Sequence, residues 1–119
     1  MKKIAICNQK GGVAKTTTAI NLSAYLALKG KRTLLIVLDP QANATSGMGI
    51  NKSELEHSVY NILHEHVGID DVIKETAVDN LSIIPSNINL TGAEVELVSG
   101  MGREYRLKKA LQEMQAEFD

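Results

Sequence analysis

A stretch near the start of the chain has the composition of a loop that binds phosphate groups. Residues 8–18 read NQKGGVAKTTT, with paired glycines, two lysines and three threonines. Glycines allow several backbone N–H groups to point at one polyphosphate, and the positive end of a helix dipole adds to the attraction. In such a loop Lys15 would reach the β- and γ-phosphates of ATP, and the Thr16 hydroxyl would bind Mg²⁺. The stretch therefore predicts a site for ATP and Mg²⁺.

The standard phosphate-loop pattern G-x-x-x-x-G-K-[ST] is not met, because Gln9 and Ala14 occupy its two glycine positions. The alternative is a glycine-rich turn that holds no ligand. A longer pattern favours phosphate binding, since a second lysine, Lys10, stands five residues before Lys15. The methyl group of Ala14 would either weaken binding or be absorbed by a small shift, which a negative φ there would permit.

The elements on either side of this loop must position it. Residues 3–8 are apolar and β-branched, which predicts a buried strand. Residues 16–29 predict a helix that ends before Gly30, and residues 33–38 predict a second buried strand. A strand, a helix and a strand with short connections form a βαβ unit with parallel strands. A loop between its first strand and its helix is where α/β proteins bind phosphate.

The middle of the chain predicts shorter elements. Residues 39–49 are small and polar and read as a loop. Ser53 begins a capping-box pattern that would open a short helix, and residues 69–76 predict another. Residues 81–84 predict a third strand, which Pro85 stops.

Two helices are predicted towards the end of the chain. Thr91 begins a second capping-box pattern, ahead of a helix to about Val98. Residues 103–118 form the clearest amphipathic pattern, with apolar side chains at helical spacing: Leu107, Leu111, Met114 and Phe118. The charged side chains between them predict a solvated face.

Composition narrows the class of protein. The 119 residues suit one domain, and 44% hydrophobic with 23% charged residues excludes a disordered or collagen-like chain. A net charge of −1 gives no support for a nucleic-acid-binding arm, and no apolar run is long enough for a membrane helix. The single cysteine, Cys7, excludes an internal disulfide and is expected in the core. We expect a cytoplasmic protein.

Three histidines lie close together at His57, His64 and His66. A metal site would need His64 and His66 on an extended segment, because on a helix they point apart. We expect surface polar side chains there instead.

Residues 10–16, KGGVAKT, resemble the deviant Walker A motif K-G-G-x-G-K-[ST] of the ParA/MinD ATPases, with Ala14 as the departure. Residues 39–47, DPQANATSG, are similar to the segment D-P-Q-G-N-A-T-S-G of ParA/Soj partition ATPases. Residues 85–94, PSNINLTGAE, are similar to their segment P-S-N-x-x-L-x-G-A-E, and residues 102–107 to the start of the next helix. The chain thus resembles a ParA/Soj-type chromosome or plasmid partition ATPase throughout.

The resemblance implies an α/β fold of the P-loop NTPase type, a parallel sheet flanked by helices. It implies that ATP is bound by a continuous stretch: Lys10, Gly11, Gly12, Val13, Ala14, Lys15, Thr16 and Thr17, with Mg²⁺ on Thr16. It implies that Lys10 reaches across an ATP-sandwich dimer to the phosphates bound by the partner subunit. It implies that Lys15 contacts the phosphates bound by its own subunit. Asp39 matches the switch I aspartate that positions or activates the attacking water.

Two further positions depart from the family pattern. Val37 stands where many relatives carry the first aspartate of a D-x-D pair, and Ala42 replaces a frequent glycine.

The resemblance implies slow ATP hydrolysis that drives a dimerisation cycle in DNA segregation, with a ParB-type partner, at the nucleoid and without a membrane. Relatives continue past the position of Asp119 into the Walker B strand and a C-terminal half that binds DNA, so residues 1–119 match the N-terminal part of the domain. We therefore expect an exposed parallel sheet edge and exposed apolar faces, with self-association or partial order of the chain as the result. The alternative function is a non-catalytic nucleotide-binding or dimerisation module that assembles or interferes with a full-length ATPase.

Overall fold

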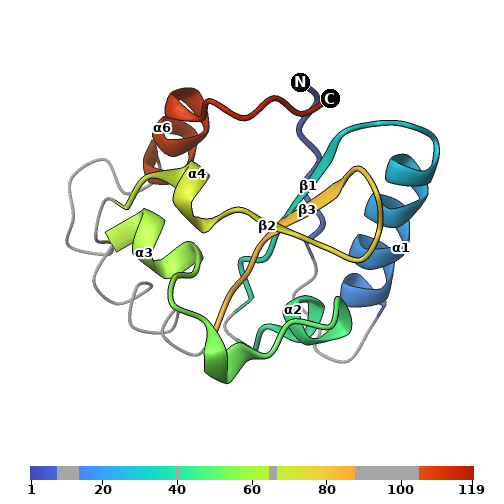
Figure 1. Cartoon of the computed structure of the whole chain (residues 1–119), viewed down its shortest axis with the longest axis horizontal. Helices are drawn as coiled ribbons and strands as arrows, with labels where there is room; N and C mark the ends of the chain where they lie inside the picture. The colour runs from blue at the N-terminus through green and yellow to red at the C-terminus, as the bar shows by residue number, and fades with distance from the viewer. Residues whose placement is uncertain (8–13, 40, 65–66, 88–104) are drawn as a thin grey trace.

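The computed structural model describes residues 1–7, 14–39, 41–64, 67–87 and 105–119, in which helices and strands follow one another as Figure 1 shows. In chain order they are α1 (Lys15–Leu28), β1 (Thr33–Ile36), α2 (Asn43–Gly47), the 3₁₀ helix η1 (Lys52–Glu54), α3 (Val59–His64), α4 (Ile69–Val72), β2 (Lys74–Glu75), β3 (Leu81–Ile84) and α6 (Arg106–Glu113). No helix within the described ranges is long and apolar enough to cross a membrane.

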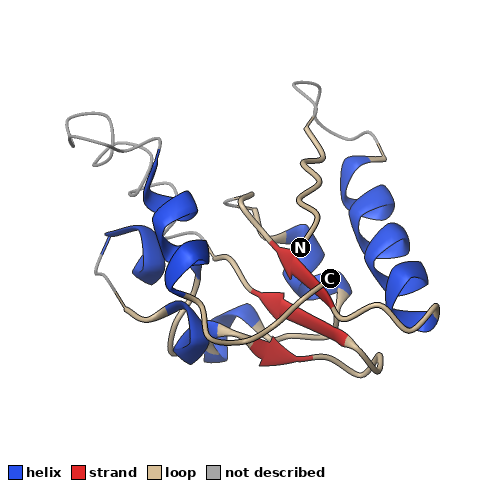
Figure 2. Cartoon of the chain, turned by 90° about the horizontal axis from the view of Figure 1, so that it is seen from above, coloured by secondary structure: helices blue, strands red, loops and turns tan. Residues whose placement is uncertain are grey.

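The sheet has three strands in the order β1-β3-β2. β1 and β3 are parallel, with Thr33 opposite Leu81 and Ile36 opposite Ile84. β2 pairs with β3 in the antiparallel direction, so the described sheet is mixed rather than wholly parallel. Figure 2 shows α1 on one side of the sheet and α3, α4 and α6 on the other. This α/β layering confirms the predicted fold class.

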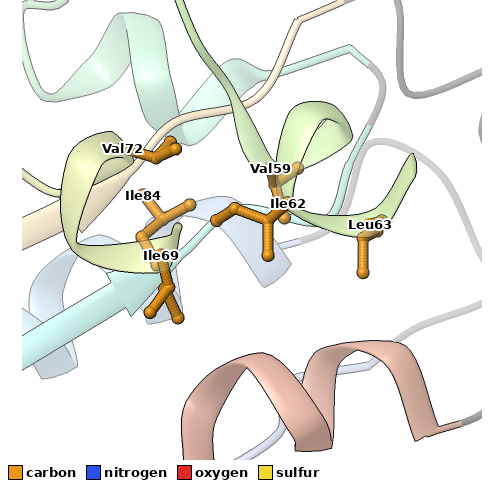
Figure 3. Close-up of a cluster of buried hydrophobic side chains, with 6 residues drawn as sticks. All are labelled: Val59, Ile62, Leu63, Ile69, Val72 and Ile84. Atoms are coloured by element: carbon orange, nitrogen blue, oxygen red, sulfur yellow. The ribbon is translucent and has the colours of Figure 1, made fainter. Parts of the chain in front are cut away.

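The two faces of the sheet carry separate hydrophobic clusters, because successive strand residues point to opposite faces. Ile84 belongs to the cluster that Figure 3 shows, with Val59, Ile62 and Leu63 of α3 and Ile69 and Val72 of α4. Apolar residues of α6 pack against the same cluster, namely Leu107, Ala110 and Leu111, with Met114 just beyond the helix. On the other face Ile83, Val37 and Ala44 form the second cluster, against which Ile20 of α1 packs.

α1 ends as the sequence predicts. Gly30 has a φ of +82°, which glycine adopts without steric cost. The Gly30 N–H donates to the Ala27 carbonyl (2.9 Å) and the Lys31 N–H to the Leu26 carbonyl (3.0 Å). This pair of bonds is a Schellman motif, which stops the helix and turns the chain into β1. The observed helix starts one residue before the predicted range and ends one residue earlier.

The predicted strand over residues 3–8 is wrong for the part that the structure describes. Residues 1–7 contain no strand, and apart from Ile6 they are exposed, including Cys7, which was expected in the core. A strand is stabilised by its neighbours, and the described residues give this segment a single backbone hydrogen bond, from the Lys2 N–H to the Asp119 carbonyl (2.7 Å). Apolar composition was therefore not sufficient to form the strand.

Other predicted elements are shorter than expected or shifted. The predicted loop over residues 39–49 contains α2. Ser53 does not cap a helix. Instead, Asn51 caps η1, because its side-chain oxygen accepts a hydrogen bond from the Ser53 N–H. The helix predicted over residues 69–76 ends at Val72, and β2 begins at Lys74. β3 has the predicted bounds, and the helix predicted from Thr91 lies outside the described residues.

The C-terminal helix stops short of its predicted end because Asp70 of α4 binds the chain beyond it. α6 ends at Glu113, whereas the apolar spacing continued to Phe118. The two carboxylate oxygens of Asp70 accept the backbone N–H groups of Gln115 and Ala116, each at 2.9 Å. These N–H groups would otherwise continue the helix, so one side chain fixes where α6 ends.

Replacing Asp70 with alanine is expected to lower the free energy of unfolding by about 1 kcal/mol, because two charge-assisted but exposed hydrogen bonds are lost. Urea denaturation followed by circular dichroism would measure this. The matched control is Asp71→Ala, since the Asp71 carboxylate lies beside Gly68 in the same helix. Equal effects of both substitutions would show that the contact with the tail is not what stabilises the chain.

Candidate nucleotide-binding site

The N-terminus of α1 is the centre of the candidate site. Lys15 is its first residue, and Thr16 and Thr17 complete the first turn. Within the part of the chain that the structure describes, no side chain caps this end, and the first turn contains no acidic residue. The first N–H groups of a helix have no partner within it and carry a partial positive charge, so this end suits an anion. Lys15 adds a full positive charge at the same place.

Ala14 does not distort the entry into the helix. Its φ is −57° and its ψ is 18°, so its φ is one that alanine adopts without strain. Its carbonyl accepts the Thr18 N–H at 2.7 Å, which begins the helical ladder. The negative φ is the condition under which the added methyl group is tolerated by the backbone. Whether it also leaves room for phosphate stays a prediction, because residues 8–13 lie outside the described residues.

The described structure places part of the predicted stretch. Lys15 and Thr16 are half-buried, while Ala14 and Thr17 are exposed. The remaining predicted binding residues, Lys10, Gly11, Gly12 and Val13, lie in the range that is not described. The structure therefore describes one half of the predicted site, the N-terminal end of α1, which supplies a lysine and a hydroxyl group.

Asp39 follows β1 at the carboxyl edge of the parallel strands. The Asp39 Oδ1 accepts the Gln41 N–H at 3.0 Å, and the Asp39 carbonyl accepts the Ala42 N–H at 2.9 Å. The carboxylate thus holds a turn of its own loop. α1 returns to the start of β1 through residues 29–32, so its N-terminus lies towards the edge where Asp39 is. Ligands of α/β proteins bind at this edge.

α2 connects the Asp39 loop to α1. Figure 1 shows α2 beside the first turns of α1, and the two helices are in contact. The approach is close at Gly47, where an added Cβ would stand 2.7 Å from the Ile20 Cδ1. Lys52 supports the loop from the other side, because its Nζ donates to the Gln41 carbonyl at 3.0 Å.

Ala42 lies in this loop in a left-handed conformation. Its φ is 55° and its side chain is fully buried, at 0% exposure. An alanine in this conformation costs about 1 kcal/mol relative to a right-handed one, whereas glycine has no such cost. The geometry explains why glycine suits this position of the family motif.

A hydrogen bond that the sequence did not predict joins the two stretches of the family resemblance. The Ser86 N–H, just after β3, donates to the Thr45 Oγ1 of α2 at 3.0 Å, and both residues have 0% exposure. The Asp39 loop is thereby attached to the end of β3, 41 residues later in the chain. The only sign of this hydrogen bond in the sequence is a threonine within a segment of small polar residues. A threonine alone does not identify the group that will donate to it.

Replacing Thr45 with valine is expected to lower the free energy of unfolding by about 1–3 kcal/mol, because the Ser86 N–H is then buried without an acceptor. Chemical denaturation would measure the loss. Thr45→Ser keeps the hydroxyl group and should retain most of the stability. If serine destabilised the chain as much as valine does, the methyl group and not the hydrogen bond would be the cause.

The remaining candidates do not form a site in the described residues. Val37 is 4% exposed and packs in the core, so an apolar side chain occupies the position at which the family pattern often has the first aspartate of a D-x-D pair. His64 is exposed and packs on the Tyr60 ring, while His57 is half-buried and His66 is outside the description. Among the described residues no group of three His, Cys, Asp or Glu side chains could hold a metal ion.

A groove of about 450 Å³ lies between α4 and α6, the helices that pack on the sheet face opposite α1. Its lining includes Asp70, Tyr105, Arg106, Lys109 and Glu113. The sequence motifs did not predict it, and it is separate from the end of α1.

Parallel strands between two helical layers, with a helix N-terminus at their carboxyl edge, are the arrangement of α/β nucleotide-binding proteins, to which the P-loop NTPases belong. Comparison with known proteins agrees. A family model described as an AAA domain (AAA_31) matches residues 1–119. The sporulation initiation inhibitor protein Soj of Bacillus subtilis (strain 168) is 55% identical over 118 residues, which are 99% of this chain and 47% of that protein. The chain therefore belongs to this family, that of the ParA/Soj partition ATPases.

Two other similarities support the assignment. The chromosome partitioning protein ParA of Myxococcus xanthus (strain DK1622) is 48% identical over 116 residues, covering 98% of this chain and 41% of that protein. The crystal structure of a cobyrinic acid a,c-diamide synthase from Mycobacterium smegmatis, with a bound ATP analogue and magnesium, has a TM-score of 0.90 at 42% identity. It covers 95% of this chain and 46% of that one. The chain thus spans about half the length of the proteins it matches.

Proposed function

We propose that this chain binds ATP and Mg²⁺ at the N-terminus of α1, as the nucleotide-binding part of a partition ATPase. The observation that carries the proposal is the helix end itself, which has no side-chain cap among the described residues, no acidic residue in its first turn, and Lys15 and Thr16 in place. This donor set fits a nucleotide, because free N–H groups and a lysine match phosphate oxygens and a threonine hydroxyl matches Mg²⁺. The structural relative from Mycobacterium smegmatis holds an ATP analogue and magnesium.

In this proposal the predicted residues have separate roles. Lys15 neutralises the β- and γ-phosphates within the subunit, and Thr16 holds Mg²⁺. Gly11, Gly12 and Val13 supply backbone N–H groups, together with Ala14 and Thr17. Mg²⁺ supplies charge neutralisation at the phosphates when it is bound.

The catalytic roles require two chains. Lys10 reaches the phosphates of a second subunit, so that dimerisation completes the site, and it stabilises the charge that develops during transfer. Asp39 positions the water that attacks the γ-phosphate; its Oδ1 accepts the Gln41 N–H, which holds the carboxylate in place while the other carboxylate oxygen can accept from the water. Slow hydrolysis then returns the dimer to monomers, in a segregation cycle with a ParB-type partner.

Titration with a fluorescent ATP analogue tests the binding step. We expect saturable binding that Mg²⁺ strengthens, that EDTA weakens, and that unlabelled ATP displaces far better than AMP, because the site contacts the β- and γ-phosphates. Circular dichroism would establish in parallel that the chain is folded. Absence of saturation in a folded chain would overturn the proposal.

The second candidate is a nucleotide-binding module without turnover. One observation favours it: Val37 is a core residue at the position where many members of the family carry the first aspartate of a D-x-D pair. Release of phosphate from ATP under single-turnover conditions separates the two functions. Mg²⁺-dependent release that is lost in Asp39→Asn supports the ATPase, whereas binding without release supports the module.

A further inference from the structure

The loop that carries Asp39 is attached to β3 on both sides of that residue. Before Asp39, the Val37 N–H donates to the Ile84 carbonyl at 3.1 Å. After Asp39, the Thr45 Oγ1 of α2 accepts the Ser86 N–H at 3.0 Å. Ile84 and Ser86 are only two positions apart at the end of β3, so the two hydrogen bonds close the loop at its base.

Further hydrogen bonds connect α2 to the backbone of Asp39. The Ser46 N–H, next to Thr45 in α2, donates to the Ala42 carbonyl at 3.1 Å. The Ala42 N–H in turn donates to the Asp39 carbonyl at 2.9 Å. The attachment of Thr45 to Ser86 therefore sets where the backbone of Asp39 lies.

The far side of the loop is packed, which leaves it few alternative positions. Ala42, Thr45 and Ser86 each have 0% exposure, and closely packed groups cannot shift without moving their neighbours. α2 also lies against α1, since an added Cβ at Gly47 would stand 2.7 Å from the Ile20 Cδ1.

A second attachment acts on the carboxylate of Asp39. The Asp39 Oδ1 accepts the Gln41 N–H at 3.0 Å, and the carbonyl of the same Gln41 accepts the Lys52 Nζ at 3.0 Å. Lys52 is half-buried in η1, outside the loop. It thus holds the residue that orients the carboxylate.

We propose that Thr45 and Lys52 are positioning residues for the water that attacks the γ-phosphate, an inference that rests on the ATPase function proposed above. Thr45 acts through the backbone of Asp39, and Lys52 acts through Gln41 on its carboxylate. A displacement of about 1 Å in a reacting group can slow a reaction about a hundredfold. The phosphates are bound elsewhere, at the end of α1, so the loss should fall on hydrolysis and not on nucleotide affinity.

Single-turnover release of phosphate from Mg²⁺-ATP, together with titration by a fluorescent ATP analogue, tests the proposal. In Thr45→Val we expect release to slow by at least about tenfold, while the dissociation constant changes by less than about twofold. Thr45→Ser keeps the hydroxyl group and should retain most of the rate. Lys52→Met removes one exposed hydrogen bond, and should slow release by about threefold.

Val72→Ala is the control for a general loss of stability. Val72 is 1% exposed and belongs to the cluster on the other face of the sheet, so its replacement destabilises the chain without touching the loop. It should leave the rate of release unchanged, with circular dichroism showing that each variant is folded.

The outcomes separate this inference from the function on which it rests. A chain without substitutions that binds the ATP analogue but releases no phosphate would overturn the ATPase and the positioning roles together. If that chain releases phosphate, then an unchanged rate in Thr45→Val, an equal loss in Thr45→Ser, or an equal loss in Val72→Ala would overturn the positioning role alone. Should Thr45→Val fail to fold, Lys52→Met decides, and an unchanged rate in that variant counts against the proposal.

Discussion

Replacing Lys15 with alanine is expected to weaken the binding of Mg²⁺-ATP by about ten- to a hundredfold. A charged hydrogen bond to phosphate contributes about 1.5–3 kcal/mol, and each 1.4 kcal/mol corresponds to a factor of ten in the dissociation constant. Lys15 is the first residue of α1, at the uncapped end that the phosphates would meet. Alanine is the strongest helix former, so the substitution should leave α1 intact. Titration with a fluorescent ATP analogue measures the change.

Lys29→Ala is the matched control for this prediction. Lys29 is the residue at which the same helix ends, and its Nζ lies over the Tyr25 ring. It carries the same charge, yet it is about 20 Å along the helix from Lys15, as the 1.5 Å rise per residue requires. Binding should be nearly unchanged. A similar loss in both variants would mean that net charge and not the helix end governs binding.

Replacing Ile84 with alanine is expected to lower the free energy of unfolding by about 2–5 kcal/mol, the largest effect on stability among the substitutions considered. Ile84 has 0% exposure and joins β3 to α3 and α4 (Figure 3). Its removal loses buried area and leaves a cavity between three rigid elements. Since domains of this size have a total stability of about 5–15 kcal/mol, part of the population should unfold without denaturant at the higher end of this loss.

The midpoint of urea denaturation measures this effect, with Ile4→Ala as the control. Ile4 is also an isoleucine of an apolar segment, but it is 65% exposed. Its replacement should change the unfolding free energy by less than about 0.5 kcal/mol. If both substitutions were equally costly, residues 1–7 would be packed in solution in a way the structure does not show.

Elements that local sequence determines were predicted well. The Ala- and Leu-rich run with Gly30 behind it specified α1 and its end, and the short apolar run closed by Pro85 specified β3. Elements that depend on distant partners were not. Residues 1–7 have the composition of a strand but no described neighbour to pair with, and α6 stops where Asp70 binds the following N–H groups.

The candidate site also has features that the sequence predicts and features that depend on distant contacts. The residue types of the phosphate loop and of the Asp39 segment could be identified from their spacing, because phosphate and Mg²⁺ require them at fixed positions. The bond between Thr45 and Ser86 and the left-handed φ of Ala42 could not, because each depends on how α2 packs against β3 and α1. What the sequence left open was how the two motif segments are held relative to each other.

The two edge strands of the described sheet, β1 and β2, differ in how readily another strand can pair with them. β2, at one end, has only two residues, Lys74 and Glu75, both charged and exposed, and such a strand discourages further pairing. β1, at the other end, is apolar and twice as long. A molecule with one edge strand open to pairing can join one neighbour. When two molecules pair through these strands, neither has an open edge strand remaining. Strand addition on both sides of the described sheet, which growth into fibres requires, is therefore disfavoured.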